Sequence, residues 1–233
     1  QEQLAEKFYV SSRTVSRWET GSNMPDLGLL IELADDLAQQ DVHYLDLFQL
    51  FEAQDEVLYL KRDSHWDNRG ACLAYNGIMD SLNLAHEDYS NRAPEIVKND
   101  NGDLNKMLYS FYGELEENFD YGLTQNYVYR NDVKSVEDGF IVTENKAGQG
   151  SMLMFRDSFG NTLIPFLSNE FAMSYYSKGV PHALERFAES YAPDCVVLQK
   201  VERNIAEYLD TPPILTAPEA ELPAAYSILT TDT

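Results

Sequence analysis

Between residues 152 and 200, three apolar segments alternate with two segments of helical character, and this alternation restricts the fold more than any other feature. Short apolar runs rich in β-branched and aromatic residues predict buried strands, whereas the segments between them have helical spacing. Two neighbouring parallel strands need a crossover connection, which is almost always right-handed. The sequence therefore predicts an α/β fold with a mainly parallel sheet, with strands at 152–157, 172–176 and 194–200 and helices at 161–168 and 181–192.

The chain on either side of this core has the same α/β character. The polar segment 119–150 is expected to form a hairpin with turns. Further strands are predicted at 42–48 and 56–62, and further helices at 69–83, 102–118 and 201–209.

Three parts are expected along the chain. Residues 1–30 have the pattern of short helices with turns between them, and residues 31–210 form the α/β domain. Residues 211–233 contain four of the nine prolines and neither Lys nor Arg, which predicts a mostly irregular, Pro-rich tail.

Composition excludes several classes of protein. A chain of 233 residues with a formal net charge of −22 is a poor general nucleic-acid binder, because phosphate contacts need clustered Lys and Arg. The two cysteines, Cys72 and Cys195, lie in apolar surroundings and are expected to be buried free thiols. No apolar run approaches the roughly 20 residues of a membrane span.

The segment "YLKRDSHWDNRGACLAY" (59–75) places Asp63 two residues before His65, at the expected carboxyl end of a strand. Ligands of α/β proteins bind beyond the carboxyl ends of the strands. A carboxylate that reaches back to an imidazole in a turn can orient that imidazole as a base. The alternative is an Asp/His turn that caps the following helix.

A second strand end carries a candidate nucleophile. In "MLMFRDSFGNTLIPFL" (152–167), Ser158 follows an apolar strand and precedes a helix. At such a turn the hydroxyl is exposed, and backbone N–H groups behind it can stabilise an oxyanion. Gly160 allows a tight turn, and Gly160 and Asn161 are the local oxyanion candidates. The alternative is that Ser158 only caps the helix.

Four motifs in this order resemble the alginate O-acetyltransferase family and the related bacterial DHHW proteins. They are "RDSHWDNRGACLAYNGIMDSL", "GDLNKML", "MLMFRDSFGNTLIPFLSNEF" and "PDCVVLQKVERNIAEYL". The resemblance covers about residues 32–210. It implies an SGNH-hydrolase-like three-layer sandwich in which the Asp-x-His motif precedes the Ser, a permuted order.

By this resemblance, Ser158 is the acyl-accepting nucleophile, His65 the general base and Asp63 its orienting acid. The implied activity is acetyl transfer to, or acetyl ester hydrolysis on, a carbohydrate outside the cytoplasmic membrane. The partners would be a polysaccharide and an acetyl donor, and no cofactor is expected. Arg203 is a further candidate for binding substrate or bracing Asp63, or it pairs with a Glu of its own helix. Trp66 either stacks on a sugar or fills the core.

The first thirty residues resemble the helix-turn-helix of phage-repressor-like regulators, with "SSRTVSRWE" as the recognition helix. The residues that this resemblance places on DNA are Ser12, Arg13, Thr14 and Arg17. The alternative function is therefore a cytoplasmic DNA-binding regulator with a catalytically silent α/β domain. A third alternative is a domain that keeps the motifs without activity. No metal site is expected, because none of His43, His86 and His182 has a second ligand at metal spacing.

Overall fold

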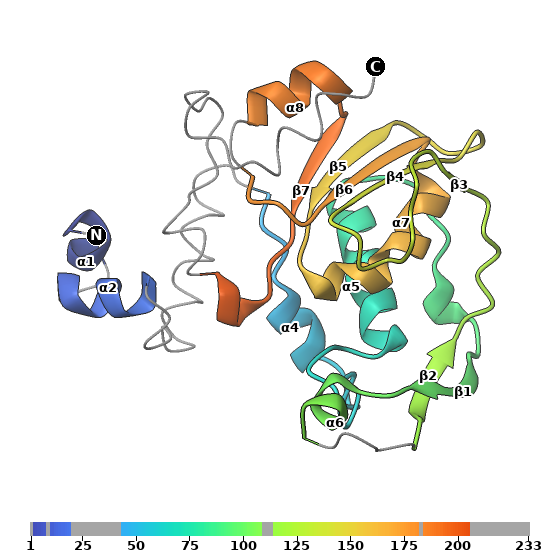
Figure 1. Cartoon of the computed structure of the whole chain (residues 1–233), viewed down its shortest axis with the longest axis horizontal. Coiled ribbons are helices and arrows are strands. Elements are labelled where there is room, and N and C mark those ends of the chain that lie inside the picture. The colour runs from blue at the N-terminus through green and yellow to red at the C-terminus, as the bar shows by residue number, and fades with distance from the viewer. Residues whose placement is uncertain (1, 8–9, 20–42, 109–113, 182–183, 206–233) are drawn as a thin grey trace. The chain divides into compact units, whose positions relative to one another are not determined.

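The computed structural model describes residues 2–7, 10–19, 43–108, 114–181 and 184–205 (Figure 1). The chain divides into two compact units. The first unit comprises Gln1–Tyr44, Leu153–Asp157 and Ser177–Thr233, and the second comprises Leu45–Met152 and Ser158–Tyr176.

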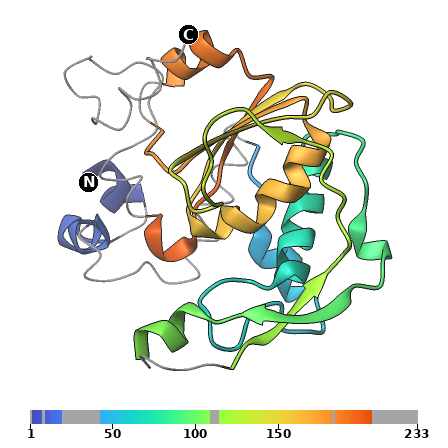
Figure 2. The same ribbon diagram turned by 45° about the vertical axis from the view of Figure 1, so that its right-hand side comes forward.

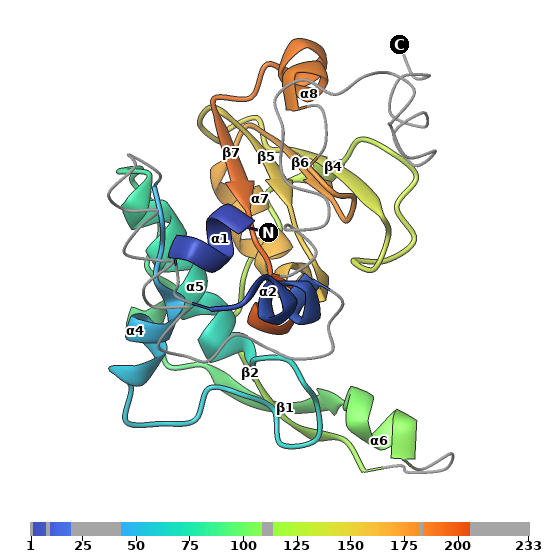
Figure 3. The same cartoon turned by 90° about the vertical axis from the view of Figure 1, so that its left-hand side faces the viewer.

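The protein is α/β, and its strands form two sheets. The smaller sheet pairs β1 (Glu95–Asp100) with β2 (Glu116–Asp120) in antiparallel register, and α6 (Asp103–Leu108) follows β1 (Figure 3). The larger sheet has the order β3-β4-β6-β5-β7, in which β3 and β4 are antiparallel. Its strands are β3 (Val128–Tyr129), β4 (Phe140–Glu144), β5 (Ser151–Phe155), β6 (Met173–Ser177) and β7 (Cys195–Leu198).

The predicted alternation of strands and helices after residue 150 is confirmed. Along the chain, β5 is followed by the 3₁₀ helix η2 (Ser158–Leu163) and by α7 (Ile164–Glu170), and then by β6. After β6 come α8 (Leu184–Tyr191), β7 and the 3₁₀ helix η3 (Glu202–Asn204). The hairpin expected within 119–150 is present as the β3–β4 pair.

The long helix α5 (Asn68–Ser81) forms the centre of the second unit. Asp67 caps it, because its carboxylate accepts the N–H groups of Arg69 and Gly70 at 2.8 and 3.2 Å. One face of α5 is apolar and buried, and it contacts η2 and α7. Figure 2 shows α5 and α7 side by side, where the rings of Tyr75 and Phe166 stack with centroids 5.2 Å apart.

Helix α7 is also joined to the larger sheet within this unit. The Ser168 hydroxyl is hydrogen-bonded to Thr143 Oγ1 of β4 at 2.9 Å and to the Tyr176 hydroxyl of β6 at 2.8 Å. All three side chains are buried, so these bonds satisfy polar groups that water does not reach.

The first unit contains α1 (Glu2–Lys7) and α2 (Ser12–Glu19), which pack through Ala5 and Val15. In the same unit the rings of Phe187 on α8 and Phe155 on β5 lie 5.1 Å apart. Asp157 accepts hydrogen bonds from Gln199 Nε2 at 2.9 Å and from the N–H of Val201 at 2.6 Å, so it stabilises the turn after β5.

Two predicted strands are wrong, and one predicted helix is correct only over its first part. Residues 43–46 form no strand, and α4 (Leu47–Glu52) begins after Asp46, whose carboxylate caps it by accepting from the N–H of Gln49. Segment 56–62 has only one isolated bridge, because the carboxylate of Glu116 takes the N–H groups of Lys61 and Arg62 that a neighbouring strand would otherwise bind.

The helix predicted at 102–118 is described only as far as Leu108, and Glu116 to Asp120 form β2 because they pair with β1. The residues of the predicted helix 201–209 beyond Ile205, the tail 211–233 and residues 20–30 lie outside the described residues. None of the helices in the described ranges is long and apolar enough to cross a membrane.

Candidate active site

The Asp-x-His motif lies in a tight loop of the second unit. An antiparallel bridge joins Tyr59 and Trp66, and the N–H of Leu60 donates to the carbonyl of His65 at 3.2 Å. Asp63 and His65 are therefore held in a hairpin-like turn and not at the end of a strand, although the turn has the short-range geometry that the sequence suggested.

Ser158 and Asp63 lie on opposite sides of the His65 ring. The Nε2 atom of His65 is 2.7 Å from Oγ of Ser158, and its Nδ1 atom is 2.5 Å from Oδ1 of Asp63. A carboxylate at Nδ1 favours the tautomer with its proton on Nδ1, which leaves Nε2 as the acceptor for the Ser158 hydroxyl. The three side chains thus form one continuous hydrogen-bonded chain.

Both oxygens of the Asp63 carboxylate accept hydrogen bonds. Its Oδ1 also accepts from the N–H of His65 at 2.9 Å, and its Oδ2 accepts from the N–H of Asp103 at 2.7 Å. The Asp63 side chain is 10% exposed, against 24% for His65. Because backbone donors occupy both carboxylate oxygens, the orientation of Asp63 is set before any substrate binds.

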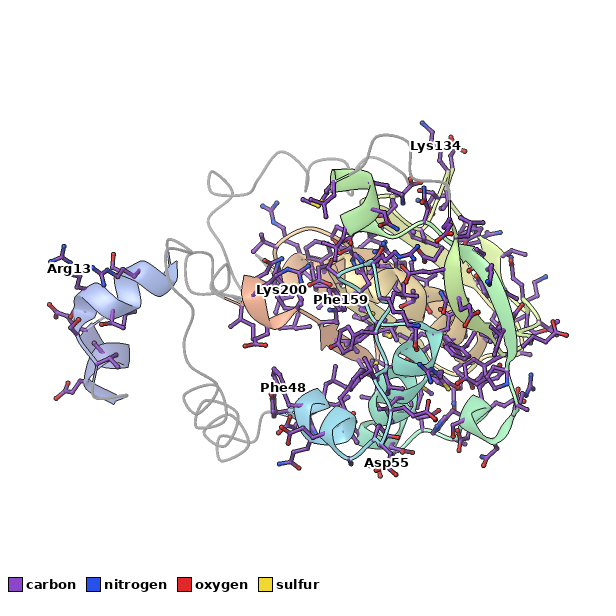
Figure 4. The ribbon with its side chains drawn as sticks, turned by 90° about the horizontal axis from the view of Figure 1, so that it is seen from below. Arg13, Phe48, Asp55, Lys134, Phe159 and Lys200 are labelled. Carbon is purple, nitrogen blue, oxygen red and sulfur yellow. The ribbon has the colours of Figure 1, made fainter. Side chains whose placement is uncertain are left out.

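Aromatic packing fixes the imidazole from the side. The ring of Phe159 lies 4.7 Å from that of His65, and Trp66 meets Phe159 edge-on at 5.2 Å. The indole N–H of Trp66 donates to Thr162 Oγ1 at 2.7 Å. Trp66 is only 4% exposed, which favours the core role over stacking on a sugar. Figure 4 shows Phe159 within the crowded interior side chains.

Asp103 is the residue of this site to which the sequence assigned no role. Its carboxylate accepts from the N–H of Ser64 at 2.8 Å and from the Ser64 hydroxyl at 2.5 Å. Partial burial opposes ionisation of Asp103, but the hydrogen bonds from Ser64 outweigh it and hold the pKa of Asp103 below its usual value. The available signal was the motif "GDLNKML", which begins at Gly102 and contributes to the family resemblance.

The oxyanion candidates lie in η2, beside Ser158. Gly160 and Asn161 are both buried, and the Asn161 amide nitrogen donates to Glu137 Oε1 at 2.7 Å. Arg203 is exposed on η3 and belongs to the first unit, so its contact with Asp63 or with a substrate stays a prediction.

The residues proposed for DNA contact, Ser12, Arg13, Thr14 and Arg17, all lie on α2. Ser11 precedes this helix, and its hydroxyl is hydrogen-bonded to Thr14 Oγ1 at 2.8 Å and accepts the N–H of Thr14 at 3.0 Å. Thr14 therefore takes part in the helix cap. DNA binding by α2 stays a prediction.

Asp63, His65 and Asp103 also place one potential metal-ligand atom each within 4.8 Å of one another. A cation on the Nδ1 side of His65 would displace the proton shared with Asp63 and compete with Ser64 for Asp103. The hydrogen bonds thus suit proton transfer at this position better than metal binding.

The sequence profile of the family described as "SGNH hydrolase-like domain, acetyltransferase AlgX" matches residues 12–147 of the chain. The match thus begins at Ser12, within the segment for which the sequence predicted a helix-turn-helix, and that prediction is not shown by the match. No curated protein sequence matches the chain.

Solved structures share the fold at low identity. A DHHW family protein from Eubacterium siraeum is 17% identical with a TM-score of 0.56, covering 74% of this chain and 70% of its own. Bacillus cereus PatB1 with a sulfonyl adduct is also 17% identical with a TM-score of 0.54, covering 71% of this chain and 68% of its own. With the profile match over more than half of its length, the chain belongs to the family of AlgX-type SGNH hydrolase-like acetyltransferase domains.

Proposed function

We propose that the protein transfers or hydrolyses acetyl esters on a carbohydrate, with Ser158 as nucleophile, His65 as general base and Asp63 as the residue that orients His65. The observation that carries the proposal is the hydrogen-bonded chain Ser158–His65–Asp63, with heavy-atom distances of 2.7 and 2.5 Å. A serine hydroxyl needs a base within hydrogen-bond reach to act as a nucleophile, and His65 Nε2 lies within that reach of Ser158.

The first half-reaction forms the acetyl-enzyme. The Ser158 hydroxyl gives its proton to His65 Nε2 as its oxygen bonds to the acetyl carbon. The oxyanion that forms is stabilised by backbone N–H groups at Ser158 and Gly160. When the tetrahedral intermediate collapses, the bond to the donor alcohol breaks, and the donor oxygen takes the proton from His65.

The second half-reaction returns the serine. His65 Nε2 accepts a proton from the acceptor hydroxyl as that oxygen attacks the acetyl carbon, and the bond to Ser158 breaks with return of the proton to Oγ. A sugar hydroxyl as acceptor gives transfer, and water gives hydrolysis. Membership of a family described by an acetyltransferase supports acetyl transfer. A polysaccharide acceptor and action outside the cytoplasmic membrane are the parts of the proposal that rest on the resemblance of the four sequence motifs to alginate O-acetyltransferases.

The direct test is hydrolysis of p-nitrophenyl acetate. Ser158→Ala and His65→Ala are each expected to lower kcat by about 10³-fold or more, because the nucleophile and the base act as one unit. His43→Ala, an exposed histidine of the first unit, is the matched control and should retain wild-type activity. Full activity in Ser158→Ala would rule out the mechanism.

A second experiment identifies the nucleophile without turnover. A sulfonyl fluoride should add one sulfonyl group to the wild-type chain, and peptide mass spectrometry should locate it on Ser158. The similar PatB1 structure contains a sulfonyl adduct, which makes this reagent class a reasonable choice. Adding an oligosaccharide acceptor then separates the two reactions, because transfer yields an acetylated sugar whereas hydrolysis yields free acetate.

A further inference from the structure

Asp103 contacts three consecutive residues of the turn, Asp63, Ser64 and His65, although it lies on a different element. Its N–H donates to Asp63 Oδ2 at 2.7 Å, and its carboxylate accepts from the N–H and the hydroxyl of Ser64 at 2.8 and 2.5 Å. The Oδ2 atom of Asp103 also lies 3.7 Å from Nδ1 of His65. Two carboxylates, and not one, therefore face the Nδ1 side of the imidazole.

Backbone contacts that do not involve the Asp103 carboxylate also hold this segment in place. Gly102 has a φ of +48°, and a Cβ there would lie 2.1 Å from the carbonyl oxygen of Arg62. The same carbonyl accepts the N–H of Leu104 at 3.1 Å. A substitution at Asp103 that keeps the size and shape of the side chain should thus leave the turn and its amide donor where they are.

The charged groups around the turn come from three elements. The turn itself contributes Asp63 and the cations Lys61 and Arg62, α6 contributes Asp103, and β2 contributes Glu116, whose carboxylate binds the backbone N–H groups of both cations. From η2, Ser158 and Phe159 contact the imidazole, and neither carries a charge. Asp103 is thus the second carboxylate in ion-pair range of His65, after Asp63.

We propose that Asp103 is a positioning residue with an electrostatic role: it fixes the Asp63–His65 turn and adds a second negative charge that stabilises His65 when it is protonated. The proposal rests on the proposed function, in which His65 takes the proton of Ser158 in each half-reaction. An anion within 4 Å of the imidazolium lowers the free energy of that state, and the effect is weakened by solvent because the Asp103 side chain is 34% exposed.

Asp103→Asn removes the negative charge of the side chain but keeps its size and shape. The backbone N–H that donates to Asp63 remains, and the amide carbonyl oxygen can still accept a hydrogen bond from Ser64. The acid limb of the pH profile of kcat/KM should move to lower pH, by up to about one unit, since the imidazole loses a stabilising charge. On the high-pH plateau kcat/KM should fall, by up to about tenfold, for the same reason.

Two matched variants control this experiment. Asp55→Asn removes one negative charge from an exposed position on the turn after α4 and should leave the profile unchanged. Ser64→Ala removes a hydrogen bond to Asp103 but keeps both carboxylates, so it should move the midpoint of the acid limb less than Asp103→Asn does.

An NMR titration of the histidine ring protons gives a readout that does not need turnover. The His65 signal is identified by its loss in His65→Ala, and its titration midpoint should move to lower pH in Asp103→Asn. An unchanged midpoint, with or without a loss of activity, would overturn the electrostatic role of Asp103. Full activity in Ser158→Ala would instead overturn the proposed function, so the two failures are distinguishable.

Discussion

His65 Nε2 lies 2.7 Å from Ser158 Oγ although the two residues are 93 positions apart in the chain. The turn between Tyr59 and Trp66 positions one partner, and the first residue of η2 provides the other. The Trp66–Thr162 hydrogen bond and the contact between the Trp66 and Phe159 rings join the two segments within the same unit. Changes that disturb either segment are thus expected to act on the His65–Ser158 distance.

Gly102→Ala should destabilise the fold and abolish most of the proposed esterase activity. The added Cβ meets the Arg62 carbonyl oxygen at 2.1 Å, so the segment that carries Asp103 must move away from the turn. We expect a loss of roughly 2 kcal/mol or more in the free energy of unfolding, from overpacking and the unfavourable positive φ. Urea denaturation and p-nitrophenyl acetate hydrolysis measure the two effects.

Gly122→Ala is the control for this variant. Gly122 also has a positive φ, +63°, but a Cβ there meets nothing within 4 Å. It should cost only about 1 kcal/mol and leave activity unchanged. Equal losses in the two variants would mean that backbone strain, and not the contact with Arg62, dominates at Gly102.

The alternation of strands and helices after residue 150 was predictable because its signals are local. Strands β5, β6 and β7 are short apolar runs, and α7 and α8 lie between them as expected. Asp63, His65 and Ser158 are candidates because of an expected strand-end position, their chemistry and the resemblance. Asp63 and His65 lie in a turn instead, yet the structure brings the three side chains within hydrogen-bond distance.

The errors arose where distant residues decide the local structure. Segment 56–62 has the composition of a strand, but Glu116, more than fifty positions later, binds the backbone N–H groups of Lys61 and Arg62. The contacts of Asp103 with Asp63 and Ser64 also join residues about forty positions apart. A local pattern of hydrophobic or polar residues does not predict contacts between residues so far apart in the chain.

Both cysteines should be unreactive in the native protein. Burial raises the pKa of Cys72 to about 12 and that of Cys195 to about 11, so very little thiolate is present at pH 8. Iodoacetamide should modify neither residue within minutes in buffer but both in concentrated urea, as intact-mass spectrometry would show. Cys195→Ala leaves Cys72 as the one thiol, so any alkylation of this variant reports on Cys72. Rapid alkylation of Cys72 in the native state would contradict the prediction.

Asp88 should make stability depend on pH in the acid range. Its pKa is lowered chiefly by the hydrogen bond from the Ser90 hydroxyl, with further help from the Ser90 N–H and the Asn76 amide. A carboxylate with a depressed pKa contributes stability above its unfolded-state value, and this contribution disappears as pH falls through the folded-state value.

Asp88→Asn should therefore be less stable than the wild type at pH 7, and the difference should shrink as pH falls below about 4. Urea midpoints measured between pH 7 and pH 3 test this expectation. Asp55→Asn, at an exposed acidic position, should show a difference from the wild type that changes little over the same range. A gap between Asp88→Asn and the wild type that widens towards pH 3 would contradict the assigned sign.

The hydrogen bond between Trp66 Nε1 and Thr162 Oγ1, 2.7 Å long, should couple stability to activity. Thr162→Val leaves the indole N–H of a 4%-exposed side chain without this acceptor, which should cost about 1–3 kcal/mol. Thr162→Ser keeps the hydroxyl and should cost less than about 1 kcal/mol, close to the loss of one methyl group. Esterase activity should fall in the valine variant and not in the serine variant, because the Trp66–Thr162 bond joins the turn to η2.

A double-mutant cycle isolates the interaction itself. Trp66→Phe removes the indole donor, and adding Thr162→Val to it should cost clearly less than Thr162→Val costs alone, since no buried N–H is then left without an acceptor. The Thr162 hydroxyl also donates to the carbonyl of Phe159 at 3.1 Å, so part of the valine effect should persist in the Trp66→Phe background. Full additivity of the two changes in urea denaturation would mean that the bond contributes nothing to folding, and the turn would then be held to η2 by the aromatic contacts of Phe159 and by the His65–Ser158 hydrogen bond.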